Sequence, residues 1–93
     1  MSYGIERTET FLREFRKHKK DSEFLNALDK KITRLIEDPE KVGGYLSGKL
    51  HGYKSTRIIR KFRLIFKIVK EQNKVYLMAI DHRKVVYADF EAD

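Results

Sequence analysis

The residues best suited to chemistry in this sequence are a run of cations. Between Lys41 and Lys70 there are nine basic side chains and no acidic one. They are Lys41, Lys49, Lys54, Arg57, Arg60, Lys61, Arg63, Lys67 and Lys70. The other twelve of the 21 Lys and Arg residues are outnumbered by the 14 Asp and Glu residues, all of which lie outside this run. A segment whose charged residues are all positive concentrates its electrostatic field, so we expect a polyanion as the partner.

The composition describes one small domain that spans residues 1–93. This length leaves no room for a second domain, and 41% hydrophobic residues are enough for one modest core. Cysteine does not occur, which excludes disulfides, thiolate metal sites and a Cys nucleophile. The polar start has no signal-peptide pattern and no apolar run has membrane-spanning length. We therefore expect a cytoplasmic protein that does not enter a membrane.

Hydrophobic periodicity predicts the element order β-α-α-β-β-β. The expected elements are a strand over 3–7, a helix from Thr8 or Thr10 to about Lys19, a helix from Asp21 or Ser22 to about Glu37, a glycine-rich loop over 42–52, and strands over 56–59, 62–69 and 75–80 with a turn at 71–74. This order predicts an α+β fold, with two N-terminal helices packed on one face of a small, mainly antiparallel sheet.

The pattern of residues 62–69 predicts that the side of the sheet away from the helices is basic. Phe62, Leu64, Phe66 and Ile68 alternate along it and should face the core. Because successive side chains of a strand point to opposite faces, Arg63 and Lys67 should lie on the side away from the helices.

Three motifs in this order resemble the RelE/ParE toxin superfamily. They are Lys49-Leu50-His51-Gly52-Tyr53-Lys54-Ser55-Thr56-Arg57-Ile58, Phe62-Arg63-Leu64-Ile65-Phe66 and His82-Arg83-Lys84-Val85-Val86-Tyr87. The superfamily pattern is a Leu-x-Gly-Tyr/Trp lead-in, a basic strand, an aromatic-Arg-Leu-Val/Ile-aromatic strand and a C-terminal His-Arg-x-x-x-Tyr. The order of helices and strands matches as well, so the resemblance covers nearly the whole chain.

The resemblance implies the toxin of a type II toxin–antitoxin pair. RelE-like members are endoribonucleases that cut messenger RNA on the ribosome without a metal or other cofactor. ParE-like members share the fold, inhibit DNA gyrase and lack the ribonuclease residues. Both are held inactive by a small antitoxin, here expected to cover the basic face with an acidic segment. A RelE-like ribonuclease is the first expectation; a gyrase inhibitor and an inert member that only binds nucleic acid remain alternatives.

Metal-free RNA cleavage sets the requirements for the candidate residues. The 2′-OH must lose a proton, the phosphorane-like transition state must be stabilised, and the leaving 5′-oxygen must be protonated. A Lys among other cations has a lowered pKa and can act as a base, because each neighbouring positive charge disfavours another. An Arg stays charged and offers forked donors to a phosphate.

By resemblance, Lys54 matches the first lysine of the ribonuclease strand, Arg63 matches its strand arginine, and Arg83 and Tyr87 match its C-terminal pair. The second lysine has no match, since Thr56 or Arg57 stands in its place, so the general base stays open. Arg57 can still stabilise charge, and His82 is a candidate acid or base by position. Additional candidate RNA contacts are Lys49, His51, Arg60, Lys61 and Lys67.

Structural alternatives exist for most of these residues. Arg63 can be a solvated strand residue, Arg83 can pair with Asp81 or Asp89, and Tyr87 can pack in the core with Phe90. Lys54 can be a phosphate contact as readily as a base. Tyr45 and Tyr53 can stack on bases or pack within the protein. His18 should lie at the surface of a charged helix, and the three histidines lack the spacing of a metal site.

Overall fold

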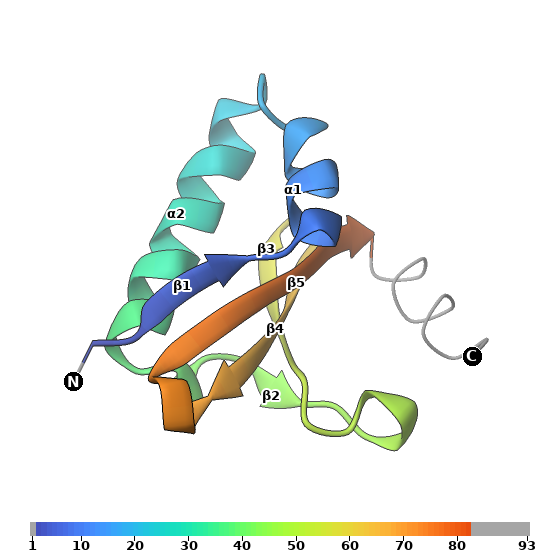
Figure 1. Ribbon diagram of the computed structural model, residues 1–93. Helices are drawn as coiled ribbons and strands as arrows, with labels where there is room; N and C mark the ends of the chain where they lie inside the picture. Colours follow the sequence, from blue (N-terminus) through green and yellow to red (C-terminus); the bar gives the residue numbers. More distant parts are fainter. Residues whose placement is uncertain (1, 83–93) are drawn as a thin grey trace.

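The computed structural model describes residues 2–82 and shows two helices against one five-stranded sheet (Figure 1). The predicted residues Arg83 and Tyr87 lie outside this range. The elements are β1 (Gly4–Arg7), α1 (Glu9–Arg16), α2 (Ser22–Glu37), β2 (Gly44–Tyr45), β3 (Lys54–Ile59), β4 (Phe62–Val69) and β5 (Lys74–His82). Short 3-10 turns cover Pro39–Lys41, Gly48–Leu50 and Lys70–Gln72.

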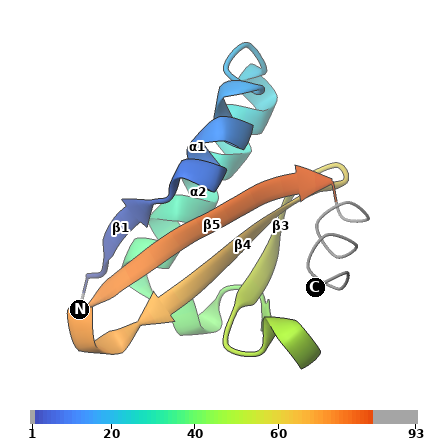
Figure 2. The same cartoon turned by 45° about the vertical axis from the view of Figure 1, so that its right-hand side comes forward.

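The sheet has the strand order β1-β5-β4-β3-β2. Strand β1 pairs parallel with β5, whereas the pairs β5–β4, β4–β3 and β3–β2 are antiparallel. Both helices lie on the same side of this sheet (Figure 2). The predicted α+β class, element order and mainly antiparallel sheet are confirmed. The two-residue β2 falls inside the segment predicted to be a loop.

Side-chain caps determine where both helices begin. The hydroxyl of Thr8 accepts from Phe11 N at 3.3 Å and also donates to the carbonyl of Leu77 at 2.8 Å, which fastens the start of α1 to β5. Asp21 caps α2 by accepting from Phe24 N at 3.1 Å. Helix α2 ends where Asp38 precedes Pro39, as predicted. Helix α1 ends at Arg16, before the predicted end near Lys19.

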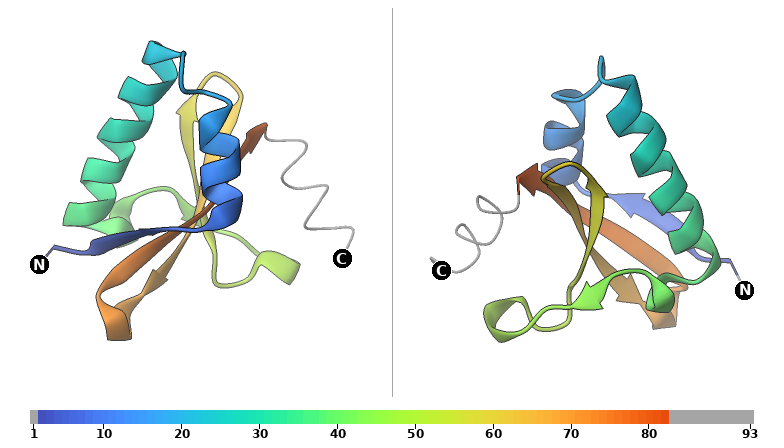
Figure 3. Two further views of the ribbon diagram at one scale, coloured as in Figure 1. Left: turned by 45° about the horizontal axis from the view of Figure 1, so that its top comes forward. Right: turned by 180° about the vertical axis from the view of Figure 1, so that it is seen from behind.

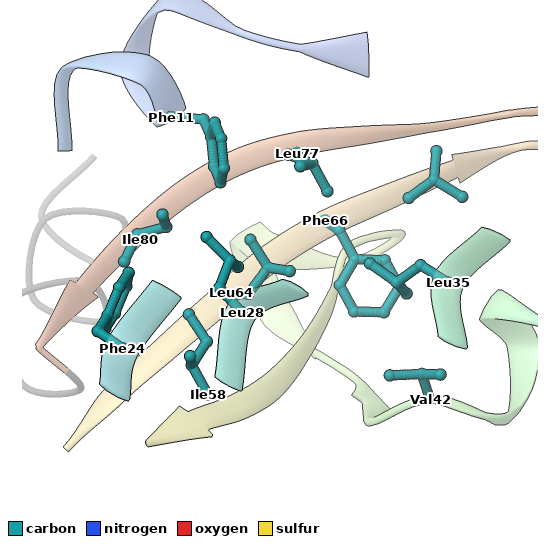
Figure 4. Close-up of a cluster of buried hydrophobic side chains, with 11 residues drawn as sticks. Phe11, Phe24, Leu28, Leu35, Val42, Ile58, Leu64, Phe66, Leu77 and Ile80 are labelled. Atoms are coloured by element: carbon teal, nitrogen blue, oxygen red, sulfur yellow. The ribbon is translucent and has the colours of Figure 1, made fainter. Parts of the chain in front are cut away.

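The core lies between the helices and the sheet, and β4 supplies its centre (Figure 4). Leu64 and Phe66 are 0% exposed there and belong to one buried cluster with side chains from α1, α2, β3 and β5. Phe62 and Ile68 pack against the same cluster. A smaller cluster on the other face consists of Ile65 and Ala79, with Leu46, Tyr53 and Met78 packed against it. The predicted alternation of β4 is therefore confirmed.

His18 is not a surface residue of a charged helix, and that prediction was wrong. It follows α1 in the turn toward α2 and is half-buried. Its ring stacks on Phe24 with centroids 3.9 Å apart and meets the edge of Phe62 at 4.7 Å. The aromatic partners come from α2 and β4, so they were not visible in the local helical pattern.

We expect His18 to make the protein less stable in mild acid. Burial lowers the pKa of His18 below 6.5, although Asp21 and Glu14 partly oppose this by favouring the charged ring. Below about pH 6.5 the unfolded chain therefore binds more protons than the folded protein, and stability falls as the pH falls. Urea unfolding between about pH 7 and pH 5 should show a smaller loss for His18→Phe than for the wild type. The exposed-site control His51→Gln should retain the wild-type loss, and an equal loss in His18→Phe would contradict the assignment.

Candidate nucleic-acid interface

Two arginines lie opposite each other on the face of the sheet away from the helices. Arg57 of β3 and Arg63 of β4 are direct partners in the antiparallel register. Side chains of such partners lie side by side on one face, and like charges placed this way repel. Within the side chains that the structure describes, neither guanidinium has a carboxylate partner. This open face thus presents two adjacent cations.

Neutral acceptors hold one nitrogen of each arginine. Arg63 Nε donates to Ser55 Oγ at 2.8 Å, and Arg57 Nε donates to the carbonyl oxygen of Arg60 at 3.2 Å. Among the described contacts, the terminal Nη groups of both side chains make no hydrogen bond within the protein. Those Nη groups are the forked donors that bind phosphate oxygens. The buried Ser55 was missed in the sequence, although its spacing of two from Arg57 already places it on the same face.

The open face continues from the arginines to an aromatic and a lysine. Ile65, the partner of Ser55 in the register, is buried in the small apolar cluster. Beyond it, Lys67 Nζ lies 5.5 Å from the ring centroid of Tyr53, which packs against that cluster. Lys67 is exposed, so the predicted placement of Arg63 and Lys67 on the side away from the helices is confirmed.

Lys54 does not lie on this face, which corrects its expected role. It is 1% exposed, and its ammonium donates to the carbonyl oxygens of Pro39 at 3.2 Å and Glu40 at 2.6 Å. Alternation along β3 places Lys54 with the buried Ile58 on the helix side. An ammonium closed to solvent and bound to two carbonyls is neither a phosphate contact nor a base in this structure. Lys54 instead attaches the turn after α2 to the sheet.

The Tyr45 side chain closes the outer side of this lysine. Its ring centroid lies 4.7 Å from Lys54 Nζ, and its hydroxyl donates to the Glu40 carboxylate. This hydrogen bond lowers the pKa of Glu40 and raises the pKa of Tyr45, because it favours the charged acid and the neutral phenol. Tyr45 is 61% exposed but committed to these contacts, which supports packing over base stacking.

Arg60 also differs from its expected role as a free RNA contact. Its guanidinium lies 2.5 Å from an Asp21 carboxylate oxygen and 3.6 Å from a Glu23 carboxylate oxygen. Other cations of the basic run are neutralised as well, since Lys41 pairs with Asp38 at 3.7 Å and Lys70 with Glu40 at 3.5 Å. The basic segment is therefore not one continuous free surface.

The remaining candidates lie in three places. Lys61 is exposed in the turn between β3 and β4. Lys49 and His51 are exposed near the short turn Gly48–Leu50, which precedes β3 and so lies at the opposite end of that strand from Arg57. The backbone of His82 pairs with Phe62, next to Arg63, at the end of β5. The structure thus brings Arg57 and Arg63 together, with the backbone of His82 beside them, and separates Lys49 and His51 from them.

Within the described part of the chain, no group of three or more His, Cys, Asp or Glu side chains could hold a metal ion. Over the same residues, neither helix combines the length and apolar character that a membrane span needs. A hollow of about 350 Å³ lies between the helices, lined by residues that include Phe11, Phe15 and Ile32. It is on the helical side and contains none of the predicted site residues.

Comparisons with known proteins identify relatives of this fold. Residues 5–87 match the family described as the ParE toxin of the type II toxin–antitoxin system parDE. The crystal structure of the toxin–antitoxin complex RelBE2 from Mycobacterium tuberculosis matches at 30% identity and TM-score 0.75, over 89% of this chain and 100% of that chain. A mutant of the E. coli toxin RelE in the free state matches at 24% identity and TM-score 0.75, over 95% and 93%. The YoeB/ParE toxin from Agrobacterium tumefaciens matches at 16% identity and TM-score 0.77, over 85% of this chain and 96% of that chain. The comparison with curated proteins gave no match.

The fold and these matches place the chain in the RelE/ParE toxin superfamily. It belongs to the ParE toxin family of type II toxin–antitoxin systems. The sequence resemblance to the superfamily is thereby confirmed.

We expect the buried ammonium of Lys54 to matter for stability. Lys54→Met preserves much of the side-chain volume but leaves the carbonyls of Pro39 and Glu40 without their donor. Loss of a partner for buried polar groups costs about 2 kcal/mol of unfolding free energy. The control Lys49→Met makes the same exchange at an exposed site and should change stability by less than about 0.5 kcal/mol. Urea unfolding measures both, and a Lys54→Met protein as stable as the control would show that the two hydrogen bonds are dispensable.

Proposed function

We propose that this toxin is a metal-free endoribonuclease that cleaves messenger RNA on the ribosome. The observation that carries the proposal is the Arg57–Arg63 pair on the open face, opposite in the register and without a carboxylate partner among the described side chains. Two guanidiniums side by side on one face of a sheet repel each other, and an anionic ligand between them would offset that repulsion. A phosphodiester group supplies two non-bridging oxygens that the forked donors of a guanidinium bind.

In the proposed reaction the two arginines bind the scissile phosphate through their Nη groups. The 2′-oxygen attacks phosphorus, a 2′,3′-cyclic phosphate forms, and the bond to the 5′-oxygen breaks. Negative charge gathers on the non-bridging oxygens in the transition state, and donors held in place beforehand stabilise it most. The hydrogen bonds of Arg63 to Ser55 and of Arg57 to Arg60 supply that fixed placement.

Proton transfer requires groups beyond the two arginines. Burial removes Lys54 from the candidates, since its ammonium already donates to two carbonyls. We keep His82 and Tyr87 as the proposed acid and base, and Arg83 as a third phosphate contact. Support for His82 comes from its backbone position, which pairs with Phe62 beside Arg63. Lys67, Lys61, Lys49 and His51 would contact the RNA on either side.

The proposed partners are the ribosome with its messenger RNA and a cognate antitoxin. Solved relatives include the toxin–antitoxin complex RelBE2 and a YoeB–YefM complex from Staphylococcus aureus, which supports an antitoxin for this chain. An acidic antitoxin segment would neutralise the same open face that binds RNA. These partners are cytoplasmic, and we propose the same location for this toxin.

A second candidate function is inhibition of DNA gyrase. The observation that favours it is the burial of Lys54, because the ribonuclease pattern relies on lysines of this strand and the second one is already replaced. The description of the matching family as a parDE toxin is compatible with either activity. DNA damage signalling on expression, with translation continuing at first, would support the gyrase function.

We expect Arg57→Ala and Arg63→Ala each to lower RNA cleavage by about 100-fold, because each removes a donor to the transition-state phosphate. The measurement is the mapping of new messenger RNA 5′ ends after induction, together with cleavage by purified protein and ribosomes. The control Lys30→Ala removes one positive charge from the exposed helical side and should leave cleavage unchanged. Growth arrest with intact messenger RNA would reject the ribonuclease function, and neither arrest nor cleavage would indicate a member that only binds nucleic acid.

A further inference from the structure

One carboxylate joins the start of helix α2 to the turn between β3 and β4. Asp21 uses Oδ1 to accept from Phe24 N at 3.1 Å, which caps the helix. Its other oxygen, Oδ2, accepts from the Arg60 guanidinium at 2.5 Å. Figure 3 shows the β3–β4 hairpin reaching toward the end of the molecule where α1 turns into α2. The turn is therefore anchored to the helical layer.

The anchored turn has an unusual backbone at its first residue. Arg60 has φ of 53°, in the left-handed region that residues with a Cβ rarely adopt. The β3–β4 register also shifts between Arg57 and Ile59, immediately before this residue. A conformation of this kind persists only when its surroundings hold it. This end of the hairpin is held by ion pairs of Arg60 with Asp21 and Glu23, among other contacts. The Phe62 ring also packs against His18 and Phe24.

The backbone of Arg60 in turn sets the position of Arg57. The Arg60 carbonyl oxygen accepts from Arg57 Nε at 3.2 Å. Because that carbonyl follows from the φ and ψ of the turn, a change in the turn would redirect it and release the guanidinium. A continuous series of contacts thus runs from Asp21 through Arg60 to Arg57, which stands beside Arg63.

We propose that Asp21 and Arg60 are positioning residues for the phosphate-binding Arg57. Asp21 holds the turn through the Arg60 side chain, and the Arg60 carbonyl fixes Arg57 Nε so that its Nη groups meet the phosphate. This inference rests on the proposed function of the Arg57–Arg63 pair. It assigns a role to two residues that do not themselves contact RNA.

The direction in which Asp21→Asn changes RNA cleavage distinguishes a positioning role from simple charge attraction. Asp21→Asn keeps a good helix cap, since Asn and Asp cap equally well, but removes the nearer of the two carboxylate charges that pair with Arg60. It also makes this end of the protein more positive. If only charge mattered, RNA binding and cleavage would rise. If positioning matters, kcat should fall about tenfold while KM for RNA stays the same or decreases.

Arg60→Gly tests the other half of the contact series. Glycine adopts a positive φ without strain and keeps the carbonyl, but the anchor to Asp21 is lost. We expect a similar tenfold loss in kcat. Two control variants make the same charge changes at other sites. Asp29→Asn matches Asp21→Asn, and Lys20→Ala matches the loss of positive charge in Arg60→Gly. Both controls should cleave RNA like the wild type. In an Arg57→Ala background, Asp21→Asn should have no further effect, because its target is gone.

An NMR measurement tests the inference independently of RNA cleavage. In the wild type the Arg57 Nε–H should exchange slowly with solvent, and in Asp21→Asn and Arg60→Gly it should exchange about tenfold faster. The Arg63 Nε–H, held by Ser55, is the internal reference and should not change. Melting temperatures of both variants report whether the fold is intact.

The outcomes are distinguishable from those of the proposed function. A wild-type protein that leaves RNA intact overturns the ribonuclease proposal, whereas the Arg57 signal still decides whether Asp21 and Arg60 position it. Unchanged Arg57 exchange in both variants overturns the positioning role. So does an Asp21→Asn protein that cleaves as fast as the wild type, or one whose loss persists in the Arg57→Ala background.

Discussion

The register of β4 is the constraint on which the remaining structure depends. Leu64 and Phe66 fill the space under the two helices. They do so only when their face of β4, and not the face of Arg63, is turned toward the helices. A slip by one residue would turn Arg63 toward the helices and expose the apolar set. Packing of the core therefore decides that Arg63 faces outward and that Arg57 stands opposite it. The placement of the cations is a consequence of hydrophobic burial on the other side of the same strand.

The cations of the basic run lie in two different environments. Lys41, Arg60 and Lys70 are paired with carboxylates, and Lys54 is buried against carbonyl oxygens. The Arg57–Arg63 pair has only neutral acceptors among the described residues, although two like charges side by side are unfavourable. Neutral acceptors orient a guanidinium without cancelling its charge. This difference separates the cations that are paired or buried within the described part of the fold from the two arginines that have only neutral acceptors there.

The sequence predicted the features that depend on local pattern. Each helix cap was predicted as one of two residues, and the structure has Thr8 and Asp21. The alternation of β4 was correct as well, because these features follow from neighbouring residues. Lys54, Arg60 and His18 have surroundings that the sequence did not predict, for a common reason. Their partners are Glu40, Asp21 and Phe62, which come from other elements and cannot be read from a strand or helix pattern. The roles of Arg83 and Tyr87, beyond the described residues, remain predictions.

The parallel pairing of β1 with β5 has a consequence for biosynthesis. Gly4 pairs with Lys74, so the first strand acquires its neighbour only after most of the polypeptide has been translated. Val75, Leu77 and Ile80, all fully buried, also arrive with this last described strand. Native contacts between such distant segments form late, and a nascent chain that lacks them exposes its apolar faces. A product truncated before residue 74 would thus be an unfolded polypeptide open to proteolysis, and not a partly working toxin.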